Sequence, residues 1–207
     1  MNFLAHLVLA PQTPKGLIGA IAPDMIRGPL PADLHESVML SAQEHRSIDR
    51  FTDLHRGFIQ TRDRLRTFVH PRLTGVLADI LYDHVLARDW VHWREDNFAN
   101  YVSNVEAGLI AALHQVPDQM RLVVKKMIDE QWLISYATAD GICARLETMS
   151  RRLTARVGRP MSLVISGQDL QTIYKHIVTD FALLWPDLLD HVEQRRIKRY
   201  ECFADPF

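Results

Sequence analysis

Three side chains between residues 44 and 53 are of the types that bind metal ions or act on phosphoesters. His45, Asp49 and Asp53 are spaced four residues apart, so in a helix they stack above one another on one face. An imidazole with two carboxylates suits a hard or borderline divalent metal ion. The competing interpretation is a solvated face whose carboxylates pair with neighbouring arginines, each pair worth roughly 0.2 to 0.5 kcal/mol. Arg46 has a functional alternative, because a guanidinium can clamp a phosphate through two hydrogen bonds.

A second group repeats these residue types within the apolar stretch 77–86. Asp79 and Asp83 are one helical turn apart, and His84 lies about 100° round from Asp83. Their neighbours are mostly aliphatic, and a carboxylate among such residues is costly to bury unless it is paired or bound to a metal. A salt bridge to an arginine of a neighbouring helix would also explain them. We favour metal ligation.

Two more candidate ligands lie closer to the N-terminus. His6 interrupts a short apolar segment, and Asp24 follows Pro23 in another. Taken alone, His6 fits a hydrogen-bonded histidine, and Asp24 fits either a helix cap or a carboxylate that is paired or bound to metal. Metal sites in helical bundles are built from side chains on facing helices, so candidates on separate helices strengthen the metal interpretation.

The pattern of apolar residues, prolines and glycines predicts a compact all-α bundle of seven to nine helices. The predicted helices cover approximately residues 2–10, 33–55, 58–69, 71–93, 97–114, 117–132, 142–157 and 166 onward. The predicted N-caps are Asn2, Asp33 and either Asn97 or Asn100. Residues 16–28 are rich in small residues and are predicted to form a tight apolar turn that carries Asp24. Pro186 is expected to kink or interrupt the last helix, and residues 161–165 are the one short candidate for a strand.

Length and composition indicate a single domain, residues 1–207. The 24 Lys and Arg against 25 Asp and Glu give a net charge of −1, which argues against a nucleic-acid-binding protein. Any acidic partner must therefore meet a local basic patch. Basic residues gather in three segments, 56–72, 145–159 and 195–199. Each segment is either a solvated helix face or a docking surface for an acidic macromolecule.

Several features predict a cytoplasmic protein with no membrane partner. No apolar run approaches the roughly 18 residues of a membrane span, and the first residues do not resemble a signal peptide. Cys143 and Cys202 are the only cysteines, which indicates a reducing compartment and no disulfide framework. The oligomeric state is left open.

Five segments, taken in order, resemble the acyl carrier protein phosphodiesterase family, also called acyl carrier protein hydrolase. They are Met1–His6, Gly19–Gly28, His45–Asp53, Asp79–Leu86 with Trp90, and Gln131–Tyr136 followed by Gly141 and Ile142. Any one of these motifs is weak, but their ordered spacing is specific. The resemblance covers most of the chain and weakens after about residue 145. It implies an all-helical relative of the HD phosphohydrolases.

The resemblance also implies a reaction. A family member would hydrolyse the phosphodiester that joins 4′-phosphopantetheine to a serine of holo-acyl carrier protein, leaving apo-acyl carrier protein. Manganese is the expected metal, with magnesium as the alternative, because the candidate ligands combine carboxylates with imidazoles. We expect Asp24, His45 and Asp83, with His6 or His84, to bind it.

The remaining candidates would act around the metal. Asp49 would orient His45 or act as a general base, and Arg46 would hold the phosphate oxygens. His84, if it is not a ligand, could protonate the leaving group.

Acyl carrier proteins are small and acidic, so an entrance lined by Arg56, Arg62 and Arg66 would steer their docking. Two other functions stay open at this point. One is an HD-type phosphohydrolase that acts on a nucleotide or another small phosphoester. The other is a non-catalytic helical module that binds an acidic protein and uses its polar clusters as buried ion pairs.

Overall fold

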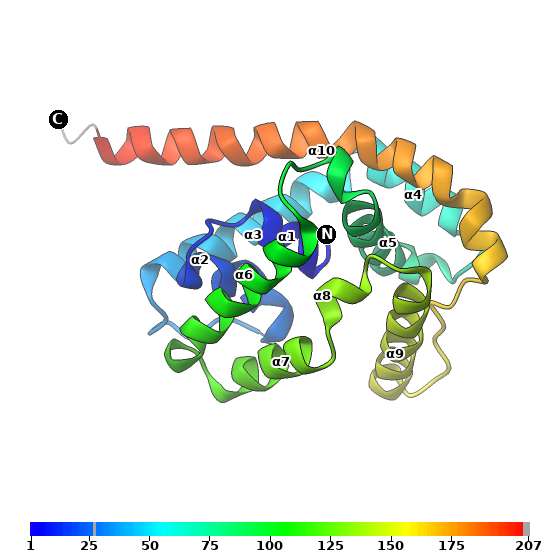
Figure 1. The fold of residues 1–207 in the computed structure, drawn as a ribbon, viewed down its shortest axis with the longest axis horizontal. Coiled ribbons are helices and arrows are strands. Elements are labelled where there is room, and N and C mark those ends of the chain that lie inside the picture. Colours follow the sequence, from blue (N-terminus) through cyan, green and yellow to red (C-terminus); the bar gives the residue numbers. More distant parts are fainter. Residues whose placement is uncertain (27, 205–207) are drawn as a thin grey trace.

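The computed structural model describes residues 1–26 and 28–204, with side chains described as far as residue 199. Over these residues the chain forms ten α-helices, nine of them at least seven residues long, and no strand (Figure 1). The helices are α1 (Phe3–Leu9), α2 (Pro14–Met25), α3 (Glu36–Leu54), α4 (Arg56–Leu65), α5 (Thr74–Arg88), α6 (Phe98–Ala112), α7 (Asp118–Asp129), α8 (Trp132–Ser135), α9 (Ala139–Val157) and α10 (Gly167–Ala204). The all-α prediction is confirmed. Cys143 is a free thiol, whereas the side chain of Cys202 lies outside the described residues.

Side-chain caps fix where several helices begin. Asn2 accepts a hydrogen bond from the backbone N–H of Phe3, and Asn97 accepts one from the backbone N–H of Asn100, as predicted. The start of α3 differs from the prediction, because His35 and not Asp33 is the cap. The Nδ1 atom of His35 accepts the N–H two residues further on, which is the bond that an Asp at this position would accept.

The segment predicted as a tight turn, residues 16–28, is instead largely helical and forms most of α2. Its small residues serve close packing between helices. A Cβ atom added to Gly19 would lie 2.5 Å from the carbonyl oxygen of Val38 in α3. Pro23 falls in the last turn of α2, where it removes one backbone hydrogen bond shortly before the helix ends at Met25. Asp24 is therefore carried by a helix end that is pressed against α3.

Other boundaries also differ from the predicted ones. Pro71 begins a short 3₁₀ turn, Pro71–Leu73, that precedes α5. Gln131 separates α7 from α8 with a φ of 51°, a left-handed conformation that hydrophobic periodicity does not reveal. Residues 161–165 form no strand. The last helix, α10, continues through Pro186, because a helix packed against α3, α4 and α5 tolerates one lost hydrogen bond.

The short helix α1 lies in the middle of the molecule. Six of its seven residues are buried, and it packs against α2 and α5. Around it, α2 packs along α3, while α10 runs along α4 across the top of Figure 1 and α9 contacts α5 and α8. This arrangement places His6, near the middle of α1, inside the core. None of the described helices combines the length and apolar character needed to cross a bilayer.

Candidate metal centre

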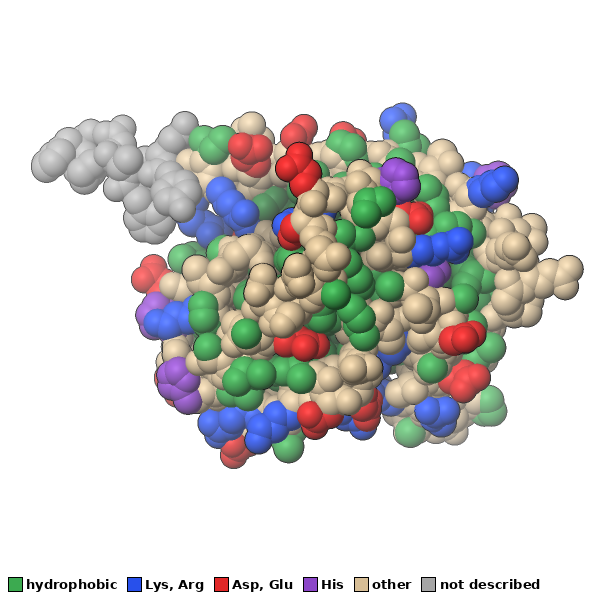
Figure 2. Space-filling view, in the orientation of Figure 1, with side chains coloured by type: hydrophobic (Ala, Val, Ile, Leu, Met, Phe, Trp, Pro, Cys, Tyr) green, Lys and Arg blue, Asp and Glu red, His purple; other side chains and the backbone are tan. Residues whose placement is uncertain are grey.

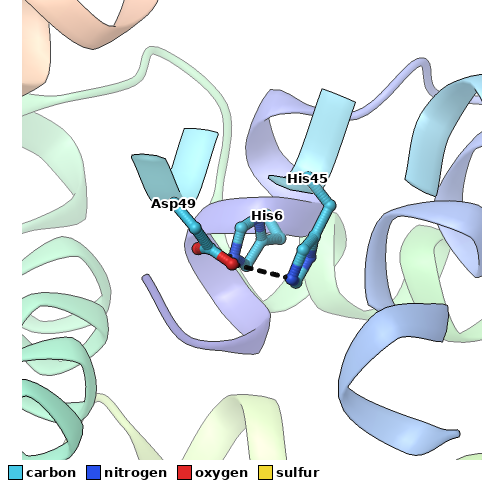
Figure 3. A group of neighbouring side chains, drawn as sticks. All are labelled: His6, His45 and Asp49. Atoms are coloured by element: carbon cyan, nitrogen blue, oxygen red, sulfur yellow. Dashed lines mark ion pairs between the residues drawn. The ribbon is translucent and has the colours of Figure 1, made fainter. Parts of the chain in front are cut away.

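Three of the predicted site residues form one cluster, with His6 from α1 and His45 and Asp49 from α3 (Figure 3). Nε2 of His45 lies 3.0 Å from one oxygen of Asp49, and Nε2 of His6 lies 3.1 Å from the other. The two imidazole rings are stacked, with centroids 3.7 Å apart. Within the described residues, this is the one group of three or more His, Cys, Asp or Glu whose ligand atoms all lie within 4.8 Å of one another.

A backbone carbonyl fixes the orientation of His45. Nδ1 of His45 lies 2.7 Å from the carbonyl oxygen of Ala20, so Nδ1 must carry the proton that it donates. In the neutral ring, Nε2 then presents a lone pair toward Asp49. A lone pair and a carboxylate oxygen 3.0 Å apart require a shared proton or a bound cation between them. The carbonyl is also the kind of outer partner that orients histidine ligands in metal sites.

His6 is fully buried, and its nitrogens are not satisfied by the protein. Neither nitrogen has a hydrogen-bond partner among the described residues, although Nε2 is close to Asp49. Burial lowers the pKa of His6 to about 3, so the ring is neutral at pH 7 and can act as a ligand. Buried polar groups are normally bonded, and an unsatisfied imidazole beside a carboxylate fits a metal-ligating role. The residues present therefore suit a divalent ion.

Asp24 extends the cluster from the last turn of α2. One of its oxygens lies 3.7 Å from Nε2 of His45, and its side chain is 39% exposed. Burial raises the pKa of Asp24, while the nearby His45 opposes that rise. Asp24 also lines a cavity beside the cluster, so it faces both the histidines and the space that a substrate could enter.

The carboxylate of Asp49 is the electrostatic centre of the group. Burial alone would raise the pKa of Asp49, but the adjacent imidazoles of His45 and His6 and the α-amino group of Met1 lower it well below its usual range. For His45, burial lowers the pKa, whereas Asp49 and Asp24 raise it by more. A carboxylate that stays ionised beside two imidazoles is a suitable ligand for a cation.

The second predicted group, Asp79, Asp83 and His84 on α5, does not form a single cluster. Asp79 pairs with the α-amino group of Met1 at 2.8 Å, and that same ammonium lies 3.4 Å from Asp49. Burial lowers the pKa of this ammonium, but Asp79 and Asp49 raise it to about 11. Asp79 is thus linked to the cluster through the start of the chain, a contact that helical periodicity cannot predict.

Asp83 was expected to bind metal, and the structure places it at the beginning of α1. Its two oxygens accept the backbone N–H groups of Leu4 and Ala5 at 2.7 and 3.0 Å. Burial raises the pKa of Asp83 to about 7, although these two N–H groups oppose the rise. Because the first N–H groups of a helix lack partners within it, Asp83 satisfies and anchors α1. It therefore helps to position His6.

His84 lies in a different environment from the cluster. Its Nδ1 donates to the carbonyl oxygen of Tyr136 at 2.6 Å, and its ring packs edge to face on Tyr174. Its Nε2 atom has no partner among the described residues, and burial lowers the pKa of the ring. Arg46 and Asp53 are exposed on α3 and do not line the cavity.

The cavity beside the cluster has a volume of about 940 Å³. Asp24 and Asp79 supply carboxylates to it, and Arg152 and Arg156 of α9 also line it. Most of the remaining lining is apolar, comprising Met1, Phe3, Met25, Val76, Ile80, Val123, Trp132, Met149, Leu153 and Ala155, with Asn2 as a polar exception. Its size and mixed lining are typical of small-molecule sites. No sequence signal distinguished Trp132 from an ordinary core residue.

Comparison with known proteins decides the family. The family model for acyl carrier protein phosphodiesterase matches residues 1–188. The chain belongs to this family. The match continues well beyond residue 145, where the resemblance was expected to weaken, and it covers α9 and about half of α10.

Individual members of the acyl carrier protein phosphodiesterase family align over nearly the whole chain. The one from Photorhabdus laumondii is 28% identical over 98% of both chains. Those from Pectobacterium atrosepticum and Klebsiella pneumoniae are 26% and 28% identical, over 95% of this chain and 100% of theirs. No solved structure matches significantly. The family name denotes a phosphoric diester hydrolase, a chemistry in which divalent metal ions commonly serve.

Proposed function

We propose that this protein hydrolyses the phosphodiester between 4′-phosphopantetheine and a serine of holo-acyl carrier protein, using a divalent metal ion. Membership of the acyl carrier protein phosphodiesterase family supports the substrate. The cluster of His6, His45 and Asp49 supports the metal, and the unsatisfied buried imidazole of His6 is the observation that carries this part. Asp24, whose oxygen lies 3.7 Å from His45, would complete the ligand set.

The reaction needs a nucleophilic water and stabilisation of charge on the phosphoryl oxygens. A divalent ion, when bound, supplies a Lewis acid for those oxygens and increases the acidity of water at neutral pH. The protein's part is to hold the donors. The carbonyl of Ala20 sets the tautomer of His45, and Asp83 anchors the helix that carries His6. Asp24 lines the cavity and so presents a carboxylate to the reacting phosphoester.

The donor set indicates which metal would bind. Two imidazoles and two carboxylates combine nitrogen with oxygen ligands, whereas magnesium sites are dominated by oxygen. Manganese accepts both types. We therefore propose manganese in preference to magnesium.

Mass spectrometry of holo-acyl carrier protein tests this proposal. Incubation with the protein and manganese should remove the mass of 4′-phosphopantetheine, and a chelator should prevent the loss. A parallel sample containing a nucleotide phosphodiester in place of the carrier protein tests the alternative substrate class. No mass change with a folded, manganese-loaded sample would contradict the proposed reaction.

A further inference from the structure

The cavity has walls of opposite charge. On one side, Asp24 and Asp79 adjoin the cluster, and on the other side Arg152 and Arg156 project from α9. Figure 2 shows Lys and Arg side chains together with Asp and Glu side chains at the lower right of the molecule, over α9, so the basic wall is defined by the lining residues Arg152 and Arg156. The acidic wall suits a metal ion. The basic wall suits a different and negatively charged partner.

The charge on this part of α9 is strongly one-sided. Residues 148–157 of α9 contain three arginines, Arg151, Arg152 and Arg156, and no Asp or Glu, and Arg159 follows just after the helix. Arg151 lies 3.9 Å from Glu147, one turn earlier on the helix. Arg152 and Arg156 take part in none of the ion pairs found among the described side chains. Their positive charges are therefore available to another molecule.

Trp132 holds part of this surface in place. The guanidinium carbons of Arg145 and Arg152 lie 4.1 and 5.0 Å from the centre of its ring. The ring is buried and lines the cavity. Such cation–π contacts already restrict the arginine side chain, so it loses less conformational entropy when it binds a partner. Arg152 is thus oriented at the edge of the cavity before any partner arrives.

The arginines of α4 differ in both location and bonding. Arg56, Arg62 and Arg66 were expected to form the entrance, yet none of them lines the cavity. Arg62 packs over the ring of Phe58, and Arg66 pairs with Asp63 at 3.2 Å. A carrier protein that presents its serine to Asp24 would meet α9 at the cavity edge.

We propose that the α9 arginine face, formed by Arg152 and Arg156 beside Trp132, is where an acidic acyl carrier protein docks. This inference rests on the proposed function, which supplies the partner. The face would attract the acidic surface around the modified serine while the phosphodiester enters the cavity toward Asp24. Charges at the edge of an interface chiefly accelerate encounter and make it sensitive to salt.

The test compares two double charge reversals of equal size. Arg152→Glu with Arg156→Glu should raise KM for holo-acyl carrier protein by at least ~10-fold while kcat changes little. Arg56→Glu with Arg66→Glu, on α4, should leave KM near that of the wild type. Arg152→Lys with Arg156→Lys keeps the charge and should restore most of the affinity. An unchanged KM in the α9 reversal, or an equal rise in the α4 reversal, would overturn the docking surface.

A binding measurement separates this inference from the proposed reaction. Apo-acyl carrier protein should bind the metal-free protein, more weakly as salt increases, and the α9 reversal should weaken that binding by a similar factor. Binding without cleavage of holo-acyl carrier protein would overturn the reaction but retain the surface. If the α9 reversal cleaves holo-acyl carrier protein with the wild-type KM, the docking surface is overturned and the reaction is retained.

Discussion

Helices α3 and α5 each carry one candidate histidine and two candidate aspartates, yet the fold uses them differently. On α3, His45 and Asp49 meet His6 of α1 within a few ångströms. On α5, Asp79 pairs with the amino group of Met1, Asp83 caps α1, and His84 bonds to a carbonyl beyond α8. The α3 residues share one face toward α1. On α5, Asp79 and Asp83 lie one turn apart and His84 about 100° round from Asp83, but each of the three meets a different partner.

This difference shows that an aspartate in the interior can either cap a helix or face other candidate metal ligands. A buried Asp needs compensation, and at Asp83 the compensation is two backbone N–H groups, which requires no metal. Asp49 is only half-buried, and its neighbours are the α-amino group of Met1 and two imidazoles, one of which lacks any hydrogen-bond partner among the described residues. The partners, and not residue type alone, therefore separate Asp83, which positions α1, from Asp49, the proposed ligand.

The largest expected effect comes from removing a member of the α3 group. His45→Ala should lower turnover of holo-acyl carrier protein by ~10²- to 10³-fold or more, a scale typical for loss of a group that stabilises the transition state. Circular dichroism should show that the helical content is kept. His84→Ala, a matched buried histidine on α5, should change turnover far less. An equal loss of turnover in both variants would contradict the proposal that the α3 histidine, and not the α5 histidine, belongs to the metal centre.

The next effect concerns the anchor of α1. Asp83→Ala leaves the buried N–H groups of Leu4 and Ala5 without acceptors, which should reduce the free energy of unfolding by about 1 to 3 kcal/mol. Because α1 carries His6, manganese affinity should also fall. Urea denaturation measures the first change and calorimetric titration the second. Reduced affinity with unaltered stability would instead indicate a direct ligand role for Asp83.

A third variant tests the close contact of α2 with α3. Gly19→Ala places a Cβ atom 2.5 Å from the carbonyl oxygen of Val38, so the two helices must separate. The expected cost is about 1 to 3 kcal/mol, as for other overpacked sites. The same shift moves Asp24 relative to His45, so kcat should fall as well. Gly167→Ala, at a position with open space, is the control and should alter kcat little.

The last expected effect is a dependence on pH, which is spread over the range between two pKa values. Burial raises the pKa of Asp83 to about 7 from its ordinary value of 3.8. Between these values the folded protein retains a proton that the unfolded chain has lost, so the free energy of unfolding falls as pH rises. Relative to Asp83→Asn, which does not titrate, the wild type should lose at most about 1.4 kcal/mol per pH unit. Urea denaturation between about pH 5 and 7 measures the difference, and a constant difference would contradict a raised pKa.

The sequence permits prediction of much of the fold and part of the cluster. Helical periodicity and the caps Asn2 and Asn97 locate most helices because they are local signals. The spacing of His45 and Asp49 places both on one face for the same reason. Residues 16–28 were wrongly predicted as a turn, because the partner of Gly19 lies on another helix. The partners of Asp83 are 78 and 79 residues away, and no local pattern encodes such a contact.

Manganese binding tests the central claim, that α1 and α3 form the metal centre, most directly. Calorimetric titration of the wild type, His6→Ala and His84→Ala compares two buried histidines that the sequence treats alike. We predict one tight manganese site in the wild type, which is lost in His6→Ala and kept in His84→Ala. Tight binding that survives in His6→Ala but disappears in His84→Ala would place the metal on α5 and contradict the account.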